Sequence, residues 1–216
     1  MPPDTQPIRF VRSGADAQPP PAPFRNIAVL GLGDRGLSLA LAARRRWPAA
    51  LVIGVDLHGR LERAVRLHAI DVGAPDLSIL GGAQLIVLAC PFGERLGHIQ
   101  RLCDYVEGDF LVTDLGGPKA VLFERARALD RLTFIGGHPV LHPASAGSRI
   151  SAERFDGIHW FLVPDPARPR PEAVECLESF VMALGARPEQ LAPEEYERRL
   201  AVSNGLKAPD SEGDDD

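Results

Sequence analysis

The sequence predicts a single α/β domain built on a doubly wound, mostly parallel sheet. The first observation is length, because 216 residues suffice for one well-packed domain of this class. The second is pattern: short strands that are apolar on both faces alternate with helical segments, as in a parallel sheet covered on two sides. The third is a glycine-rich turn at residues 31–36, between the first strand and the first helix. Together they indicate a Rossmann-type fold.

Strands and helices are expected to alternate along most of the chain. Four consecutive apolar residues from Leu85 to Leu88 mark a strand buried on both faces. Gly185 follows the longest C-terminal helix, as a capping glycine would. The expected strands are Asn26–Leu30, Leu51–Val55, Gln84–Ala89, Phe110–Thr113, Thr133–Gly136 and Trp160–Val163. The expected helices are Asp34–Arg46, Leu61–Leu67, Gly93–Tyr105, Lys119–Leu129, Glu172–Leu184 and Pro193–Ser203.

Both ends of the chain are expected to be disordered. Residues 1–25 hold seven of the 20 prolines, a composition typical of an extended arm. Residues 206–216 are rich in acids that repel one another, and little there can be buried. Five of the 29 acidic residues lie in 210–216, and without them the remaining 24 acidic and 24 basic residues balance. We therefore expect a neutral folded domain over residues 26–205.

Composition excludes several classes of partner. A body with no basic excess is not expected to bind nucleic acid. No apolar run approaches the ~18 residues of a membrane span, and the proline-rich start lacks the apolar core of a secretory signal. The three cysteines include no Cys-x-x-Cys pair, which favours free thiols in a reducing compartment. We expect a cytoplasmic protein that contacts neither nucleic acid nor membrane.

The turn after the first strand has the pattern of a dinucleotide-binding site. Gly31, Gly33 and Gly36 form a G-x-G-x-x-G motif between a predicted strand and a predicted helix. The glycines let the backbone approach a pyrophosphate, and the helix N-terminus supplies N–H donors. Asp56 ends the second strand, where a carboxylate binds a ribose 2′-hydroxyl and repels a 2′-phosphate. This favours NAD over NADP, although Arg60 lies nearby. The alternative is a glycine turn that binds no cofactor.

Two charged residues inside this turn are unusual beside a pyrophosphate. In one interpretation, Asp34 stabilises the first helical turn and Arg35 balances its charge. In the other, Arg35 reaches into the site and binds an anionic substrate. We favour the charge-balancing interpretation and place both residues near the cofactor.

Three later strands end at the same edge of the predicted sheet, where ligands bind in such folds. Cys90 and Pro91 follow one of these strands and are expected beside the cofactor, with the thiol buried. His138 is the best candidate for acid–base catalysis, because imidazole titrates near neutral pH. Lys119 is a second candidate: it could contact the cofactor, an anionic substrate or a helix end, and Asp114 could orient it.

A metal site is not predicted. His138 and His142 are four residues apart, but Pro139 and Pro143 keep the segment from forming a helix. No third ligand lies near them in the sequence, and zinc takes at least three protein ligands. The other histidines show no spacing that indicates a metal site.

These motifs together resemble the prephenate and arogenate dehydrogenases of tyrosine biosynthesis. The resemblance covers about residues 25–204, and its most specific parts are Gly-Gly-His-Pro at 136–139 and the Asp-x-Gly-x-x-Lys pattern at 114–119. It implies an NAD(P)-dependent oxidative decarboxylation of a small anionic cyclohexadienol. In this family the histidine that corresponds to His138 draws off the proton of the ring hydroxyl while hydride leaves to the nicotinamide.

The chain departs from the family pattern at three points. The family has a serine at the position of Gly117, which helps to hold substrate and histidine, and often His-Asp in place of Glu195-Tyr196. A further helical domain, which builds the dimer, is expected to be absent. Gly117 and Arg35 are therefore weaker candidates for substrate contact. A homodimer or a separate helical partner would complete the site.

Three functions remain open at this point. The first is a compact dehydrogenase of this family that acts on an anionic ring or keto acid. The second is an NAD-binding protein that is non-catalytic or depends on a partner. The third is another NAD(P)-dependent reductase on the same fold.

Overall fold

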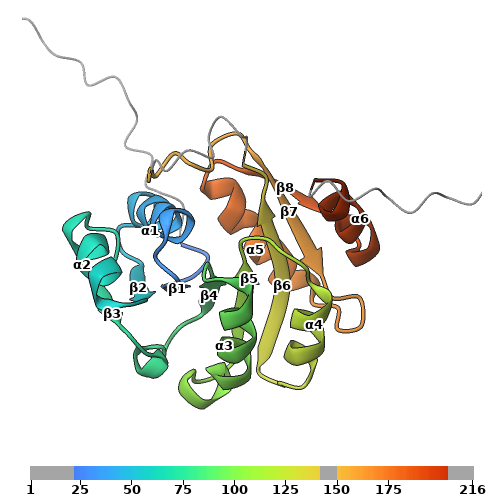
Figure 1. Ribbon diagram of the computed structural model, residues 1–216, viewed down its shortest axis with the longest axis horizontal. Helices are drawn as coiled ribbons and strands as arrows, with labels where there is room; N and C mark the ends of the chain where they lie inside the picture. Colours follow the sequence, from blue (N-terminus) through green and yellow to red (C-terminus); the bar gives the residue numbers. More distant parts are fainter. Residues whose placement is uncertain (1–21, 142–149, 204–216) are drawn as a thin grey trace, which may run out of the picture.

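The computed structural model describes residues 22–141 and 150–203. An eight-stranded sheet runs through this part of the chain in the order β3-β2-β1-β4-β5-β6-β7-β8 (Figure 1). The first six strands are β1 (Asn26–Leu30), β2 (Leu51–Val55), β3 (Val72–Ala74), β4 (Leu85–Leu88), β5 (Phe110–Asp114) and β6 (Leu132–Pro139). They are parallel to one another, whereas β7 (His159–Pro164) is antiparallel to β6 and β8 (Arg187–Gln190) is parallel to β7.

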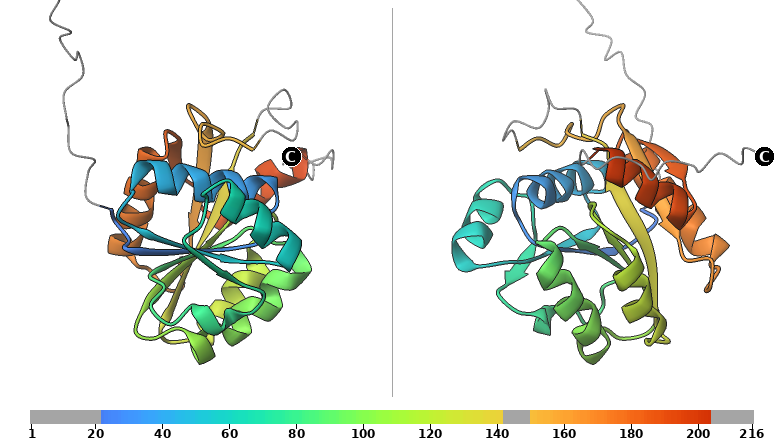
Figure 2. Two further views of the ribbon diagram at one scale, coloured as in Figure 1. Left: turned by 90° about the vertical axis from the view of Figure 1, so that its left-hand side faces the viewer. Right: turned by 45° about the vertical axis from the view of Figure 1, so that its right-hand side comes forward.

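Helices cover both faces of this sheet, which confirms the doubly wound α/β prediction. On one face lie α1 (Asp34–Arg46), α2 (His58–Arg66) and α5 (Pro171–Ala183), and on the other α3 (Phe92–Tyr105), α4 (Ala120–Arg127), α6 (Pro193–Ser203) and the short 3₁₀ helix η1 (Leu77–Ile79). Figure 2 shows α1 on one side of the sheet and α3 and α4 on the other. In β1, Ile27 and Val29 enter one core while Ala28 and Leu30 enter the other, as strand alternation requires.

Two edge strands are absent from the sequence-based assignment. β3 has three residues, two of them exposed, and a glycine at its centre. β8 reads Arg-Pro-Glu-Gln and buries none of its residues. Edge strands need no apolar face, and proline is tolerated there because one side forms no ladder. Hydropathy therefore gives no signal at either edge of the sheet.

The predicted N-terminal arm extends too far into the chain. Phe24 is buried and packs edge-on against Phe180 of α5, with ring centroids 5.9 Å apart. A large aromatic ring gains enough apolar burial to order its segment. The rest of the arm, the acidic tail from residue 206 and His142 lie outside the described residues.

The register of the central strands positions a site at their carboxyl ends. Leu30 of β1 is paired with Val55 of β2 and with Leu88 of β4, and Leu88 is paired in turn with Asp114 of β5. These four strands therefore end level with one another, and the loops that follow them meet at one edge of the sheet.

Strand β6 continues beyond this level. Its first part pairs with β5, and residues 135–139 pair only with β7, so His138 lies inside a strand and opposite Phe161. The predicted strand ends at Gly136, whereas the observed strand continues to Pro139.

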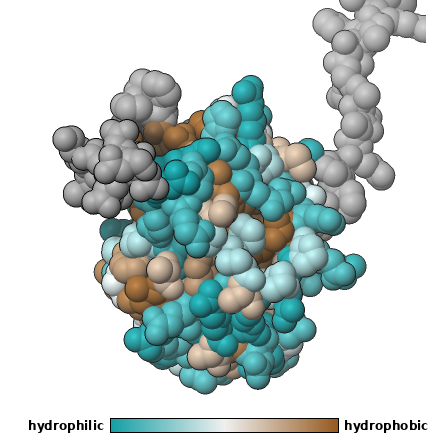
Figure 3. Space-filling view, turned by 90° about the vertical axis from the view of Figure 1, so that its right-hand side faces the viewer, coloured by the Kyte–Doolittle hydropathy of each residue, from teal (hydrophilic) through white to brown (hydrophobic). Residues whose placement is uncertain are grey.

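The surface has two further features. No helix among the described residues is long and apolar enough to cross a membrane. The side that carries α6 and β8 is mostly hydrophilic, and its apolar residues form separate patches (Figure 3).

Candidate active site

The glycine turn between β1 and α1 is closed on one side and open on the other. Gly31 has φ +97°, and a Cβ there would lie 2.5 Å from the backbone nitrogen of Cys90. A Cβ on Gly36 would overlap the carbonyl oxygen of Gly31, whereas a Cβ on Gly33 would meet nothing within 4 Å. Gly33 is also the N-cap of α1 and provides no side-chain cap. The N–H groups of the first helical turn therefore adjoin open space, an arrangement that fits a pyrophosphate.

Asp56 lies directly after β2, beside this turn. Its side chain is 7% exposed. Its oxygens accept hydrogen bonds from the backbone N–H groups of Leu32 at 2.6 Å and Leu57 at 2.7 Å, which fixes the carboxylate at the strand end. The guanidinium of Arg60 lies 3.2 Å from the same carboxylate. The position therefore offers a carboxylate for a ribose hydroxyl and, next to it, a cation that suits a phosphate.

Asp34 lies in the first turn of α1, as expected, but Arg35 does not pair with it, which corrects the charge-balancing role expected of Arg35. Asp34 lies 3.9 Å from Arg63 of α2 in an ion pair. The guanidinium of Arg35 instead points across the sheet edge and donates to the carbonyl of Leu115 at 3.4 Å. Burial, followed by the positive charges of Arg154 and Arg95, lowers the pKa of Arg35. Arg35 therefore adds positive charge to the site and does not neutralise Asp34.

A buried ionic cluster lies beneath the site. Asp114 has no exposed surface, and its carboxylate accepts hydrogen bonds from Lys119 Nζ at 2.7 and 2.8 Å, from Arg95 Nη1 at 2.9 Å and from the Gly137 N–H at 2.8 Å. Lys119 is also fully buried, and its third donor reaches the Gly137 carbonyl at 2.9 Å. Arg95 additionally donates to the carbonyls of Cys90 and Gly116. The cluster ties together the segments that follow β4, β5 and the middle of β6.

This geometry does not fit the direct catalytic contact expected of Lys119. All three ammonium donors are used inside the protein, and no part of the side chain reaches the surface. Asp114 orients Lys119, as the sequence analysis suggests, and both side chains support the site from below.

His138 lies above this cluster, on the part of β6 that extends past β5. Its Nδ1 is 3.0 Å from the hydroxyl of Tyr196 in α6, and its ring adjoins Gly116. Burial lowers the pKa of His138 to about 4, and the positive charges of Lys119, Arg35 and Arg95 contribute in that order. The imidazole is therefore neutral at physiological pH and can accept a proton.

Gly117 contributes only its backbone. It has φ +89°, and a Cβ there would point to Arg95 and Phe92 and not to His138. Its carbonyl accepts a hydrogen bond from the Tyr196 hydroxyl at 2.8 Å. The hydroxyl of Tyr196, from α6, thus lies between the carbonyl of Gly117 and the imidazole of His138.

Three contributors to the site are not identified by sequence analysis: Arg95, Tyr196 and Glu197. Glu197 accepts a hydrogen bond from the backbone N–H of Lys119 at 2.8 Å, across 78 residues of sequence. A helical position that faces the site has no local signature, because only the packing of α3 and α6 brings it there. The one sequence feature noted in this region is Glu195-Tyr196, where the family often has His-Asp.

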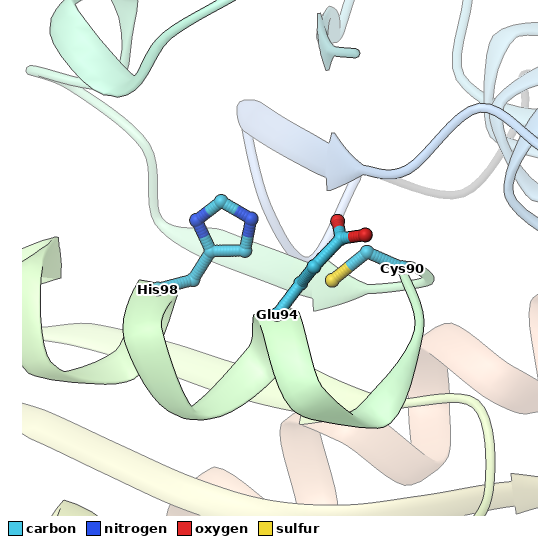
Figure 4. A group of neighbouring side chains, drawn as sticks. All are labelled: Cys90, Glu94 and His98. Carbon is cyan, nitrogen blue, oxygen red and sulfur yellow. The ribbon is translucent and has the colours of Figure 1, made fainter.

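A separate group of side chains could in principle bind a metal. Glu94 and His98 lie one turn apart in α3, and Cys90 lies just before that helix; one ligand atom from each is within 4.8 Å of the others (Figure 4). Burial raises the pKa of the Cys90 thiol to about 11. The carboxylate of Glu94 is exposed, and exposed acidic groups commonly lie together without a metal. We assign no metal to the group, and Cys90 with Pro91 remains part of the wall beside the glycine turn.

Comparisons with known proteins give a consistent picture. A prephenate dehydrogenase from Bacillus subtilis is 28% identical over 182 residues, which are 82% of this chain and 49% of that protein. The crystal structure of Synechocystis arogenate dehydrogenase superposes with a TM-score of 0.73 at 31% identity, over 82% of this chain and 63% of that one. The A. aeolicus prephenate dehydrogenase solved with hydroxyphenyl propionate and NAD⁺ has a TM-score of 0.72 at 21% identity, over 82% of this chain and 63% of that one, and supports the fold.

The extent of these matches is also informative. The chain spans about half the length of the curated relatives that it matches. Residues 39–190 match the family described as the nucleotide-binding domain of prephenate dehydrogenase, and this range contains the buried cluster and His138. With the glycine turn immediately before it, the chain belongs to the family of prephenate dehydrogenase nucleotide-binding domains.

Proposed function

We propose that this domain binds NAD and supplies the catalytic histidine for the oxidation of a small anionic ring or keto acid, such as prephenate or arogenate. The observation that carries the proposal is the position of His138. A neutral imidazole lies among three cationic side chains, on a strand that extends past the level at which the glycine turn opens. Hydride acceptance is the chemistry that a nicotinamide cofactor supplies when bound.

Each residue then has a definite task. The glycine turn holds the pyrophosphate on the first turn of α1, Asp56 binds the adenosine ribose, and Cys90 with Pro91 forms the neighbouring wall. His138 accepts the proton of the substrate's ring hydroxyl while the ring carbon that bears this hydroxyl loses hydride. The ring carboxylate leaves as carbon dioxide and its bonding electrons make the ring aromatic. Lys119 and Asp114 position the strand ends and do not touch the substrate.

Charge explains why the substrate is expected to be an anion. Among the described residues, no carboxylate lies within 4.0 Å of the guanidinium of Arg35. The charged side chains that act most on this guanidinium are those of Arg154 and Arg95, which are also positive. A bound carboxylate would offset this excess. It would also raise the pKa of His138 from about 4, which makes the imidazole a stronger base when substrate is present.

The experiment described next also distinguishes two other functions. Because the chain spans about half of its curated relatives, the domain could bind NAD and need a second copy or a separate helical partner for turnover. Another reductase on this fold would act on a different substrate in the reducing direction.

The experiment combines turnover with binding. Purified protein is mixed with NAD and prephenate, then with NAD and arogenate, and nicotinamide reduction is followed by absorbance. Loss of a general base costs about 10²- to 10⁴-fold, so H138A should lose at least 100-fold of the activity. The matched control is H159Q, because His159 is an exposed histidine on the neighbouring strand β7. Calorimetry with NAD and NADP separately tests the predicted preference for NAD.

The outcomes separate the proposals. Turnover that H138A retains would overturn the role of His138. Binding without turnover would indicate a partner-dependent domain, and failure to bind either dinucleotide would overturn the proposal as a whole.

A further inference from the structure

Tyr196 and His138 come from distant parts of the chain and meet at the site. Tyr196 is 1% exposed, and its ring lies edge-on to the imidazole, with centroids 5.8 Å apart. Its hydroxyl is 3.0 Å from His138 Nδ1 and 2.8 Å from the carbonyl oxygen of Gly117. The phenol therefore bridges two groups with different hydrogen-bonding capacities.

The placement of hydrogens follows from these capacities. A phenol hydroxyl carries one hydrogen, and a carbonyl oxygen only accepts hydrogen bonds. The hydroxyl of Tyr196 must therefore donate to Gly117, since two oxygens 2.8 Å apart repel each other without a hydrogen between them. Its oxygen is then free only to accept, so Nδ1 of His138 must carry a hydrogen. Burial raises the pKa of Tyr196, so the phenol stays protonated in the physiological range.

The other ring nitrogen is left with its lone pair. Nε2 of His138 lies beside Gly116. A Cβ on residue 116 would be 3.6 Å from Nε2, and because this residue is glycine no side chain covers the nitrogen from that side. Lys119, Arg35 and Arg95 are the charged groups that act on the ring, and all three oppose a second proton. The neutral imidazole thus has one donor, directed to Tyr196, and one acceptor, at Nε2.

We infer that Tyr196 is a positioning residue that holds His138 in the tautomer with hydrogen on Nδ1, so that Nε2 is the atom that accepts the substrate proton. The catalytic meaning of this assignment rests on the proposed function. The tautomer itself is a property of the free domain and can be measured without any substrate.

The first test is NMR of the full chain with ¹⁵N-labelled histidine at pH 7, because a ring nitrogen resonates differently with and without hydrogen. A matching spectrum of H138Q identifies the signals of His138 among the six histidines. We expect hydrogen on Nδ1 and none on Nε2. The reverse tautomer in the unaltered protein would overturn the inference, and this result depends on no variant that must keep the site intact.

The second test removes the hydroxyl. In Y196F the constraint is lost, and we expect the signals of His138 to shift toward the tautomer with hydrogen on Nε2. The matched control is Y105F, because Tyr105 is the other tyrosine of the chain and its hydroxyl contacts Arg101 of the same helix. Circular dichroism confirms that both variants are folded. An unchanged His138 spectrum in folded Y196F would contradict the inference.

Kinetics separate this inference from the proposed function. If the domain turns over prephenate or arogenate, Y196F should lower kcat about tenfold or more with little change in KM, because a fraction of the imidazole presents the wrong nitrogen. Y105F should leave both constants unchanged. If neither substrate reacts, the proposed function fails, while the NMR result still decides the role of Tyr196.

Discussion

The two sides of the site are built in different ways. The side formed by β1, β2 and the start of α1 presents mainly backbone groups. It is open, because a Cβ on Gly33 would meet nothing within 4 Å. The side formed by β5, β6 and α6 uses side chains, and its charged groups are closed off from solvent beneath His138. An open backbone site of this kind suits a dinucleotide, a ligand that many different proteins bind. A closed set of side chains fixes the geometry of one imidazole, on which a specific reaction depends.

The largest effect is expected from the closed side. D114A removes the carboxylate and leaves the ammonium of Lys119 buried without a counter-charge, which should destabilise the fold by about 3–5 kcal/mol. In K119M the carboxylate still pairs with Arg95 and the Gly137 N–H, so we expect a loss of only about 2 kcal/mol. Urea unfolding of both variants measures these free energies. Equal losses would show that Asp114 is not the centre of the cluster.

The same contrast explains what the sequence could predict. The glycine turn, Asp56 and the positions of the central strands along the chain are local patterns, and the structure has them where the sequence places them. His138 was identified by its place near a strand end. Tyr196 and Arg95 were missed because their contacts depend on how α6 and α3 pack, and Tyr196 is 58 residues from the histidine that it contacts.

The predictions that failed have physical reasons as well. The edge strands β3 and β8 lack apolar faces, so hydropathy does not mark them. Lys119 was expected to contact the cofactor, an anionic substrate or a helix end. Lysine is seldom buried, and a sequence does not reveal that a carboxylate five residues earlier will accompany it into the core.

The open side gives a smaller effect that separates binding from stability. In G36A the methyl group overlaps the Gly31 carbonyl, and we expect a loss of about 1–3 kcal/mol of stability together with dinucleotide binding. In G33A the backbone is compatible with alanine, at φ −65° and ψ −178°, and the methyl group enters empty space.

G33A should therefore leave unfolding unchanged and weaken dinucleotide binding about tenfold, or 1.4 kcal/mol, because the methyl group occupies the space that the pyrophosphate needs. Calorimetry with NAD and thermal unfolding of both variants test the pair. Unchanged NAD affinity in a folded G33A would mean that the dinucleotide does not approach the turn.

The last effect concerns His138, which lies above the buried cluster on the closed side of the site. Its pKa is lowered from 6.5 to about 4 in the folded protein, so the unfolded chain takes up this proton first as pH falls. The stability that a neutral His138 provides is complete above pH 6.5 and is lost as pH falls toward 4. Partial exposure of the ring reduces the effect, and we expect about 2 kcal/mol.

A double difference isolates this contribution from the carboxyl groups that titrate over the same range. The free energy of unfolding is measured from pH 7.5 to pH 4 for the unaltered protein and for H138Q, and the difference between them should shrink by about 2 kcal/mol on acidification. H159Q, at an exposed histidine of β7, should run parallel to the unaltered protein. If the difference between the unaltered protein and H138Q stays constant with pH, neither burial nor the positive charges of Lys119, Arg35 and Arg95 lower the pKa of His138, and the imidazole belongs to the open side of the site.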